Sequence, residues 1–315
     1  MRAIALAAVV ASIGAALTGG GWAEEAFVTN QLSENLTVVD LTSLQPVATI
    51  AIGGKPAGIA ITPDGRFAYV TSPDAKALTV IDAATRRIIG KINTGGGPLG
   101  VAVAPDGATV YVADWYAAAV RVIDPKELRV IADIAVGASP SGLAVTPDGR
   151  LLLSADRDAD SVSVIDTATR KRLATIKVGE RPFGITIDAE GRRAYTANVG
   201  SNDVSVIDIA ENSEIGRVKT GLRPYAVALA QGRGFVTDQY DGTVSVFDLA
   251  TLKPLKRITV GDYPEGIAAT GDGRQIIVAN WESNSISVID AVELKVTGEI
   301  KVGDGPRAFG AFLRR

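Results

Sequence analysis

The sequence predicts an all-β fold, a seven-bladed β-propeller whose blades are four-stranded antiparallel sheets. Two markers carry this prediction, because each occurs seven times with the same spacing. The first is a Val-x-Asp motif, whose acidic residues are Asp40, Asp82, Asp124, Asp166, Asp208, Asp248 and Asp290. The second is a Gly-x-x-Pro motif, which ends at Pro56, Pro98, Pro140, Pro182, Pro224, Pro264 and Pro306. A period of 40 or 42 residues is typical of propeller blades and of paired-helix repeats.

The pattern within one repeat separates these two architectures. After Pro98, an alternating run of small and large residues is followed by a Pro-Asp-Gly turn. Three further β-branched or aromatic runs occupy residues 109–113, 120–123 and 130–136. No segment has a 3.6-residue apolar stripe over three helical turns. Each repeat therefore predicts four short strands joined by turns, which form one blade.

The innermost strand of each blade is expected directly after the proline of the second marker. In five repeats the second and fourth residues after this proline are small, and the third and fifth are mostly larger. The bulky face of one blade can then nest on the small face of its neighbour, as close packing requires. The chain ends are also complementary, since residues 27–30 have the pattern of a second strand and residues 308–313 that of a first strand. Their pairing would close the last blade with the C-terminal strand plus the N-terminal strands, and would remove two sheet edges.

The N-terminal segment has the features of a secretory signal. Arg2 precedes an apolar run at residues 3–17, and a small-residue cleavage site ends at Ala23. We therefore expect residues 1–23 to be a cleaved signal peptide and residues 24–315 to form a single propeller domain in the bacterial periplasm. An uncleaved anchor is the alternative. After cleavage we expect no membrane span.

The composition excludes several kinds of catalytic and metal site. The chain has no His and no Cys, and its only Met is Met1. It therefore lacks a Cys or His nucleophile, an imidazole or thiolate metal site and the usual haem ligands. A net charge of −3 gives no electrostatic reason to bind nucleic acid. We expect no cofactor, no metal, no catalytic residues and no nucleic-acid partner, and we expect a monomer.

A motif in the second strands adds a family resemblance. Its copies include Phe27-Val28-Thr29-Asn30, Tyr69-Val70-Thr71-Ser72, Tyr195-Thr196-Ala197-Asn198 and Phe235-Val236-Thr237-Asp238. Together with the Pro-Asp-Gly turns, these copies make the chain resemble the YVTN-repeat family of β-propellers over essentially all of residues 24–315. The resemblance implies an exported bacterial propeller, and some members accompany quinone-dependent dehydrogenases. Related seven-bladed propellers include lactonases, which are expected to use an active-site His that this chain lacks.

One end of the propeller is expected to collect the aromatic side chains. Loops from the fourth strand to the next blade, and from the second strand to the third, share this end. They receive Trp115, Tyr116, Phe183, Tyr225, Tyr240, Tyr263 and Trp281. Aromatic residues with polar tips are enriched where proteins contact ligands or partners. These residues are therefore candidate ligand-binding residues, and packing over the blade ends is the alternative.

Basic residues are expected around the mouth of the central channel on the same face. Arg181, Arg223 and Arg307 each adjoin the proline that opens an innermost strand, and Lys55 has the equivalent position. Guanidinium groups that converge there would suit a carboxylate or a phosphate. The alternative is that these side chains are solvated and paired with nearby acids such as Glu265.

Two repeated polar sets are expected to be structural. The Val-x-Asp acids occur once per blade, so they are spread around the circumference and cannot converge on one ion. A second set ends the second strands, where such side chains usually bond nearby backbone groups. Its members are Asn30, Ser72, Asp114, Asp156, Asn198, Asp238 and Asn280.

Three classes of function follow from these features. The favoured hypothesis is an exported binding or scaffold module for a small anionic ligand or a partner protein. The resemblance further implies a role beside a periplasmic quinone-dependent dehydrogenase. The second class is a His-independent hydrolase or lactonase-type enzyme that uses carboxylates and Ca²⁺ at the channel mouth, with Asp114, Asp156, Glu265 and Glu282 as candidates. The third is an envelope scaffold without a pocket.

Overall fold

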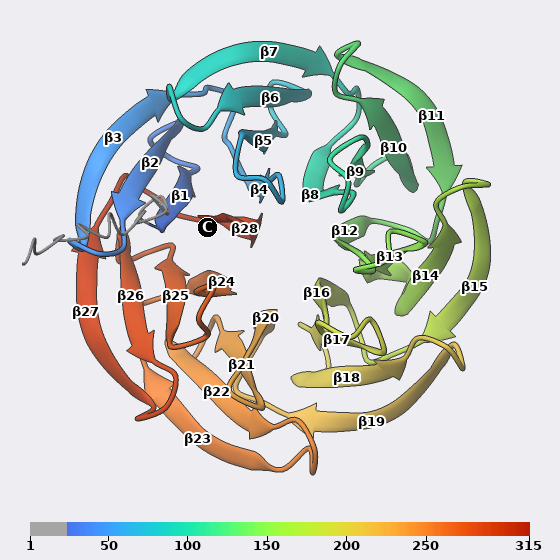
Figure 1. Cartoon of the computed structure of the whole chain (residues 1–315). Coiled ribbons are helices and arrows are strands. Elements are labelled where there is room, and N and C mark those ends of the chain that lie inside the picture. The colour runs from blue at the N-terminus through green and yellow to red at the C-terminus, as the bar shows by residue number, and fades with distance from the viewer. Residues whose placement is uncertain (1–23) are drawn as a thin grey trace, which may run out of the picture.

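The computed structural model describes residues 24–315. Seven β-sheets stand around a central axis in the manner of propeller blades (Figure 1). The predicted seven-bladed fold with four-stranded antiparallel blades is confirmed. The predicted signal peptide, residues 1–23, lies outside the described residues. In the described part of the chain, no helix is long and apolar enough to cross a membrane.

Six blades consist of four consecutive strands, ordered from the axis outward. Blade 1 contains β4 (Gly58–Ile61), β5 (Phe67–Ser72), β6 (Ala77–Asp82) and β7 (Arg87–Asn93). Blade 2 contains β8 (Pro98–Val103), β9 (Val110–Asp114), β10 (Ala119–Asp124) and β11 (Arg129–Ala135). Blade 3 contains β12 (Pro140–Val145), β13 (Leu151–Asp156), β14 (Ser161–Asp166) and β15 (Lys171–Lys177), with the 3₁₀ turn η1 (Arg157–Ala159) after β13.

The remaining blades follow the same order. Blade 4 contains β16 (Pro182–Ile187), β17 (Arg193–Asn198), β18 (Asp203–Asp208) and β19 (Ser213–Lys219). Blade 5 contains β20 (Pro224–Ala230), β21 (Arg233–Asp238), β22 (Thr243–Asp248) and β23 (Pro254–Thr259). Blade 6 contains β24 (Pro264–Ala269), β25 (Gln275–Asn280), β26 (Ser285–Asp290) and β27 (Lys295–Lys301). Blade 7 is assembled from both ends of the described chain as β29 (Leu313–Arg314), β1 (Glu25–Asn30), β2 (Asn35–Asp40) and β3 (Gln45–Ala51).

The Val-x-Asp acids end the third strands and hold the turns that follow. Asp82 accepts the backbone N–H of Thr85 at 2.7 Å, and Asp166 accepts that of Thr169 at the same distance. The hydrogen bonds from Thr85 lower the pKa of Asp82. The expected structural role of these acids is confirmed, since each side chain bonds its own local backbone.

Adjacent blades approach one another most closely at the small residues of the innermost strands. A Cβ atom at Gly58 would lie 2.0 Å from the carbonyl oxygen of Leu99 in the next blade. At Gly100 the corresponding distance, to the carbonyl oxygen of Ser141, is 1.9 Å. Glycine is required at these positions because neighbouring backbones occupy the space of a side chain.

The C-terminal segment closes the ring in two ways. Leu313 and Arg314 pair antiparallel with β1, which confirms the predicted closure of blade 7. Just before them, a further strand, β28 (Phe309–Ala311), pairs parallel with β4 and so becomes a fifth strand of blade 1. This second contact was not predicted from the repeat pattern. The segment passes from one blade to the next at Phe312, between the two strands. Gly310 in β28 has a φ of +124°, which disfavours residues with a side chain.

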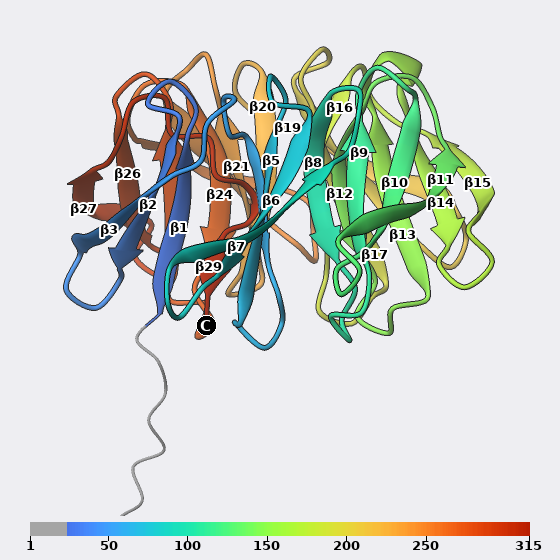
Figure 2. The ribbon, with the colours of Figure 1, turned by 90° about the horizontal axis from the view of Figure 1, so that it is seen from above.

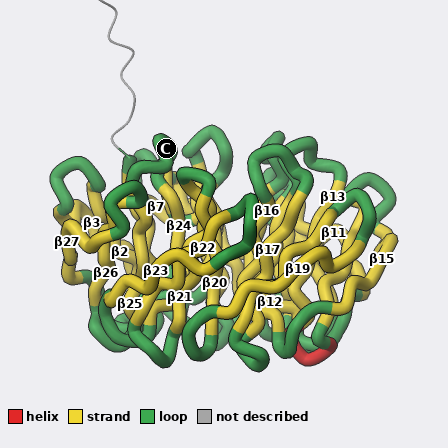
Figure 3. Tube along the Cα trace, turned by 90° about the horizontal axis from the view of Figure 1, so that it is seen from below, coloured by secondary structure: helices red, strands yellow, loops and turns green. Residues whose placement is uncertain are grey.

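The loops form two opposite faces of the disc (Figures 2 and 3). We call the face with the loops after second and fourth strands the aromatic face. The face with the loops after first and third strands is the turn face. Glu24 and Arg315 both lie at the turn face, where Glu24 accepts the backbone N–H of Gly271 at 2.9 Å.

Candidate functional site

Two of the candidate aromatic residues, Phe183 and Tyr225, are buried at the axis. They form a central group with the half-buried Trp115 and with Phe309, which was not among the candidates. The Phe183 ring lies 4.3 Å from that of Tyr225 and 5.1 Å from that of Phe309, measured between centroids. Phe183 and Tyr225 are 8% and 3% exposed. They pack with Leu99 and close the channel at the aromatic face, so the alternative of packing applies to these two residues.

A peripheral group of candidates is a row of three half-exposed rings over blades 5 and 6. The ring centroids of Tyr240 and Tyr263 lie 5.6 Å apart, and those of Tyr263 and Trp281 lie 6.3 Å apart. Tyr240 is 55% exposed and Tyr263 37%. Two exposed leucines extend the row. Leu222 accepts the backbone N–H of Tyr240 through its carbonyl, and Leu32 borders Gly305 together with Trp281.

Polar contacts fix the two ends of this row. The guanidinium carbon of Arg223 lies 4.9 Å from the centroid of the Tyr240 ring, and its Nη1 donates to the Tyr240 hydroxyl at 3.0 Å. At the other end, Trp281 Nε1 donates to Gln31 Oε1 at 3.2 Å. The rings are thereby held in place before any partner arrives. We call this surface the aromatic patch, and it comprises Leu32, Leu222, Arg223, Tyr240, Tyr263 and Trp281.

A separate pair of aromatic residues lies over blade 2. Tyr116 is 82% exposed. Its neighbour Trp115 is half-buried, and its ring lies 6.3 Å from that of Phe183 and 5.5 Å from the guanidinium carbon of Arg157. Trp115 therefore links the central group to the surface.

The four candidate basic side chains do not point to one place at the channel mouth. Lys55 pairs with Asp74 at 3.3 Å on the surface, and Arg223 contacts Tyr240. Arg181 is exposed. Arg307 pairs with Glu265 at 2.7 Å, with side chains only 15% and 7% exposed. The expected alternative of pairing with acids holds for Arg307 and Lys55, and these four side chains do not form a basic ring around the channel mouth.

The Arg307–Glu265 pair belongs to a buried network beside the central aromatic group. Arg307 also donates to the Tyr225 hydroxyl, and Gln239 Nε2 donates to Glu265 Oε1 at 2.7 Å. Burial alone would lower the pKa of Arg307, but the adjacent Glu265 carboxylate raises it above its usual value. Burial also raises the pKa of Tyr225. Both groups therefore keep their ordinary protonation at neutral pH, and the network is structural in character.

The polar residues that end the second strands bind the loops of the aromatic face. Asp156 accepts the backbone N–H of Gly137 at 2.9 Å and the hydroxyls of Ser154 and Ser163. Asp238 has the same arrangement with Gly221. Gly137 and Gly221 lie in the loops that lead into blades 3 and 5, so these two carboxylates hold those loops against the second strands in a structural role. The Ser72 hydroxyl makes no such bond. In residues 24–315, no group of three or more acidic residues is placed to hold a metal ion.

The carboxyl groups at the ends of the second strands lead to a prediction about the pH dependence of stability. Burial raises the pKa of Asp156 above its usual value, whereas at Asp114 burial is outweighed by hydrogen bonds from Gly97 and Arg121, which lower the pKa. The unfolded chain therefore releases the Asp156 proton first, and the stability contributed by Asp156 falls as pH rises above about 4. We expect Asp156→Asn to gain stability relative to the natural protein between about pH 3.5 and pH 7.

Asp114→Asn is the matched control for that experiment, because its carboxyl has the opposite pKa shift. Its stability relative to the natural protein should fall over the same interval, since ionised Asp114 stabilises the fold. Urea unfolding at the two pH values gives both differences. If the relative stability of both variants changed in the same direction with pH, the opposite pKa shifts of Asp156 and Asp114 would be contradicted.

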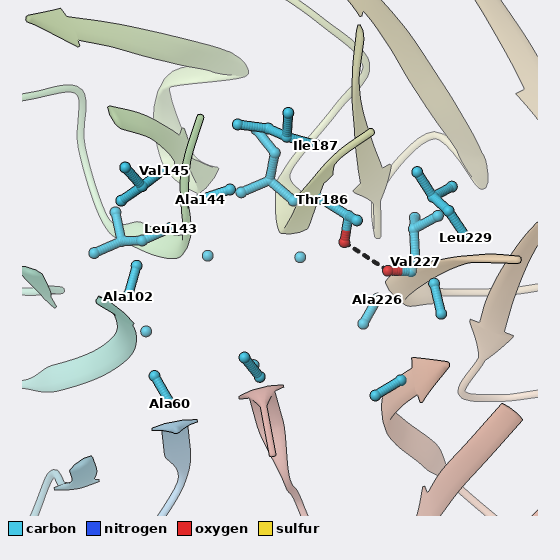
Figure 4. Close-up of a pocket in the computed structure, with 18 of the residues that line it drawn as sticks. Ala60, Ala102, Leu143, Ala144, Val145, Thr186, Ile187, Ala226, Val227 and Leu229 are labelled. Carbon is cyan, nitrogen blue, oxygen red and sulfur yellow. Dashed lines mark hydrogen bonds between the residues drawn. The ribbon is translucent and has the colours of Figure 1, made fainter. Parts of the chain in front are cut away.

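A cavity of about 590 Å³ occupies the central channel on the side of the turn face (Figure 4). Its walls are mostly the small and aliphatic residues of the innermost strands, including Ala102, Ala144, Thr186 and Ala226. The candidate residues chosen from the sequence all lie at the other face, so this cavity was missed. The alternation of small residues in the innermost strands was the available signal, and it was interpreted only as packing between blades.

Comparison with known proteins agrees with the architecture. A family model described as a YNCE-like β-propeller matches residues 9–108. The chain is a β-propeller protein. No curated protein matches its sequence.

Several solved structures share the propeller. Hydrazine synthase from Kuenenia stuttgartiensis is 21% identical, with a TM-score of 0.74, and the match covers 81% of this chain and 89% of that one. The dihydro-heme d1 dehydrogenase NirN in complex with DHE is 18% identical, with a TM-score of 0.70 and coverage of 90% and 74%. A putative 6-phosphogluconolactonase from Bacteroides fragilis is 17% identical, with a TM-score of 0.77 and coverage of 90% and 96%. At these identities, the likenesses show the fold alone.

Proposed function

We propose that this propeller is an exported binding module that docks a partner protein on its aromatic patch. The observation that carries the proposal is the row of Tyr240, Tyr263 and Trp281, whose rings touch one another and remain partly exposed. Tyr, Trp and Arg are the residues that most often dominate the binding energy of protein interfaces. The patch contains all three types and two exposed leucines.

The rigidity of the patch favours binding over a purely structural role. Arg223 and Gln31 hold the two ends of the row through hydrogen bonds, so few rotamers are lost when a partner binds. A partner with a flat apolar surface and a carboxylate near Arg223 would complement the patch. The resemblance to YVTN-repeat propellers supports a periplasmic enzyme, such as a quinone-dependent dehydrogenase, as the partner that we propose.

Binding of a small anion and carboxylate-based hydrolysis find less support in the geometry. A small anion would need free guanidinium groups at the channel mouth, and Arg307 is neutralised there by Glu265. A carboxylate-based hydrolase would need acids that converge on one point. Instead Asp114 pairs with Arg121, and Asp156 holds the loop at Gly137. Docking of a partner protein requires neither free guanidinium groups nor acids that converge on one point.

Site-specific photo-cross-linking in the bacterial envelope tests the proposal. Tyr240→p-benzoylphenylalanine places the cross-linker in the patch, at a side chain that is already aromatic and exposed. Leu173→p-benzoylphenylalanine on the outer strand β15 is the control, since Leu173 is 60% exposed but lies away from the patch. We expect a discrete adduct from position 240 and none from position 173. Adducts of equal yield, or none at position 240, would refute docking on the patch.

A further inference from the structure

The central cavity is a second concave site, on the face opposite the aromatic patch. Its volume of about 590 Å³ lies within the range of pockets for small molecules, roughly 300–1,000 Å³. It is closed at one end by the central aromatic group, because Phe309 lines the cavity and packs against Phe183 and Tyr225. Residues of the turns, among them Pro63 and Pro147, line the other end, so access is from the turn face.

The charge of the lining limits what can bind. Among the lining residues only Asp188 and Arg315 carry a charge, and both lie at the turn end. Asp188 accepts the backbone N–H groups of Arg192 and Arg193, and Arg315 donates to the carbonyl of Ala269 at 2.7 Å. No charged side chain lines the deeper part of the cavity. An ionised ligand would lose its hydration there without compensation, which is costly.

The walls combine apolar side chains with hydrogen-bonding backbone. Ala144, Ile187 and Leu229 line the cavity and remain partly exposed although they lie on innermost strands. Strands β8, β12, β16, β20 and β24 end their sheets at the axis, so one edge of each has no neighbouring strand. Such an edge presents N–H and C=O groups that need a partner. In β20 the Val227 carbonyl already has one, since it accepts the Thr186 hydroxyl at 2.6 Å (Figure 4). At β4 the chain itself meets this need, because β28 pairs with that strand.

We propose that the channel cavity binds an uncharged, largely apolar small molecule that carries hydrogen-bonding groups and enters from the turn face. The apolar body would lie against the alanine and aliphatic walls. Its polar groups would bond the free strand edges. This site is independent of the aromatic patch, because the central aromatic group separates the two.

Titration with Nile red, a neutral dye whose fluorescence rises in apolar surroundings, tests the proposal. Val145→Leu and Ala269→Leu would each narrow the cavity. Both are compatible with the fold, since Leu229 holds the equivalent position in blade 5. We expect the natural protein to bind the dye saturably at one site. In both leucine variants the affinity should be weaker by roughly tenfold or more, because one steric misfit in an apolar pocket has an effect of this size.

Two controls separate the cavity from other sites. Thr186→Ala widens the cavity and introduces the residue found at the equivalent positions of five other blades, so binding should be kept or strengthened. Tyr240→Ser removes a ring of the aromatic patch and should leave the affinity unchanged. Melting curves establish that each variant is folded. Affinity that is insensitive to both leucine variants, affinity lost in Tyr240→Ser, or the absence of saturable binding would each overturn the proposal.

Discussion

Replacing Glu25 by Ala is expected to lower the free energy of unfolding by about 3–5 kcal/mol, the usual cost of breaking a buried ion pair. Glu25 joins the two ends of the described chain, because it pairs with Arg314 at 2.9 Å and with Arg86 of blade 1 at 2.7 Å. The side chains of Glu25 and Arg314 are 10% and 7% exposed. In the variant, the carboxylate that compensates the Arg314 charge in this buried site is lost.

The control is an exposed Glu–Lys ion pair on an outer strand. Glu299 and Lys301 lie 3.6 Å apart in β27, with side chains 53% and 75% exposed. Water screens such a pair, so Glu299→Ala should change stability by no more than about 1 kcal/mol. Denaturant unfolding measures both variants. If Glu25→Ala cost as little as Glu299→Ala, closure would rest on the strand pairing of β1 and β29 and not on the ion pairs.

The repeat pattern was sufficient to predict the fold, since each blade uses the same local rules. Proline opens the innermost strand, and an aspartate at the end of the third strand holds the next turn, as Asp82 does with Thr85. Spacing therefore predicted the number of blades and the closure of blade 7. The parallel pairing of β28 with β4 could not be predicted in this way, because it breaks the repeat and joins two different blades.

The face of each candidate residue was predicted, but its exposure was not. Phe183 and Tyr240 were both assigned to the aromatic end from strand order. Phe183 points across the axis into other rings, whereas Tyr240 lies farther out over blade 5 and stays exposed. The structure places Phe183 in the innermost strand β16 and not in a loop, whereas Tyr240 lies in the loop after β21. The position of Phe183 directly after Pro182 was the available signal for a place at the axis. The channel cavity was hidden because strand edges from several blades form it together.

The buried network around Arg307 gives the second large prediction. Glu265→Ala is expected to cost about 3–5 kcal/mol of stability, because Arg307 would remain buried without a carboxylate. The double variant Glu265→Met with Arg307→Met removes both charges and fills similar space. Its stability should exceed that of Glu265→Ala because no charge stays buried, but it should remain below that of the natural protein, since the Gln239 amide and the Tyr225 hydroxyl lose their partners at about 1–3 kcal/mol for each group.

The comparison of these two variants decides what Arg307 does. If the unpaired charge of Arg307 is the main cost of Glu265→Ala, removing both charges relieves that cost. Tyr225→Phe should then cost only about 0.5–1.5 kcal/mol, the net value of one hydrogen bond. Denaturant unfolding of the three variants measures these differences. A double variant as unstable as Glu265→Ala would mean that the lost hydrogen-bond partner of Gln239, and not the unpaired charge of Arg307, accounts for the cost of the single variant.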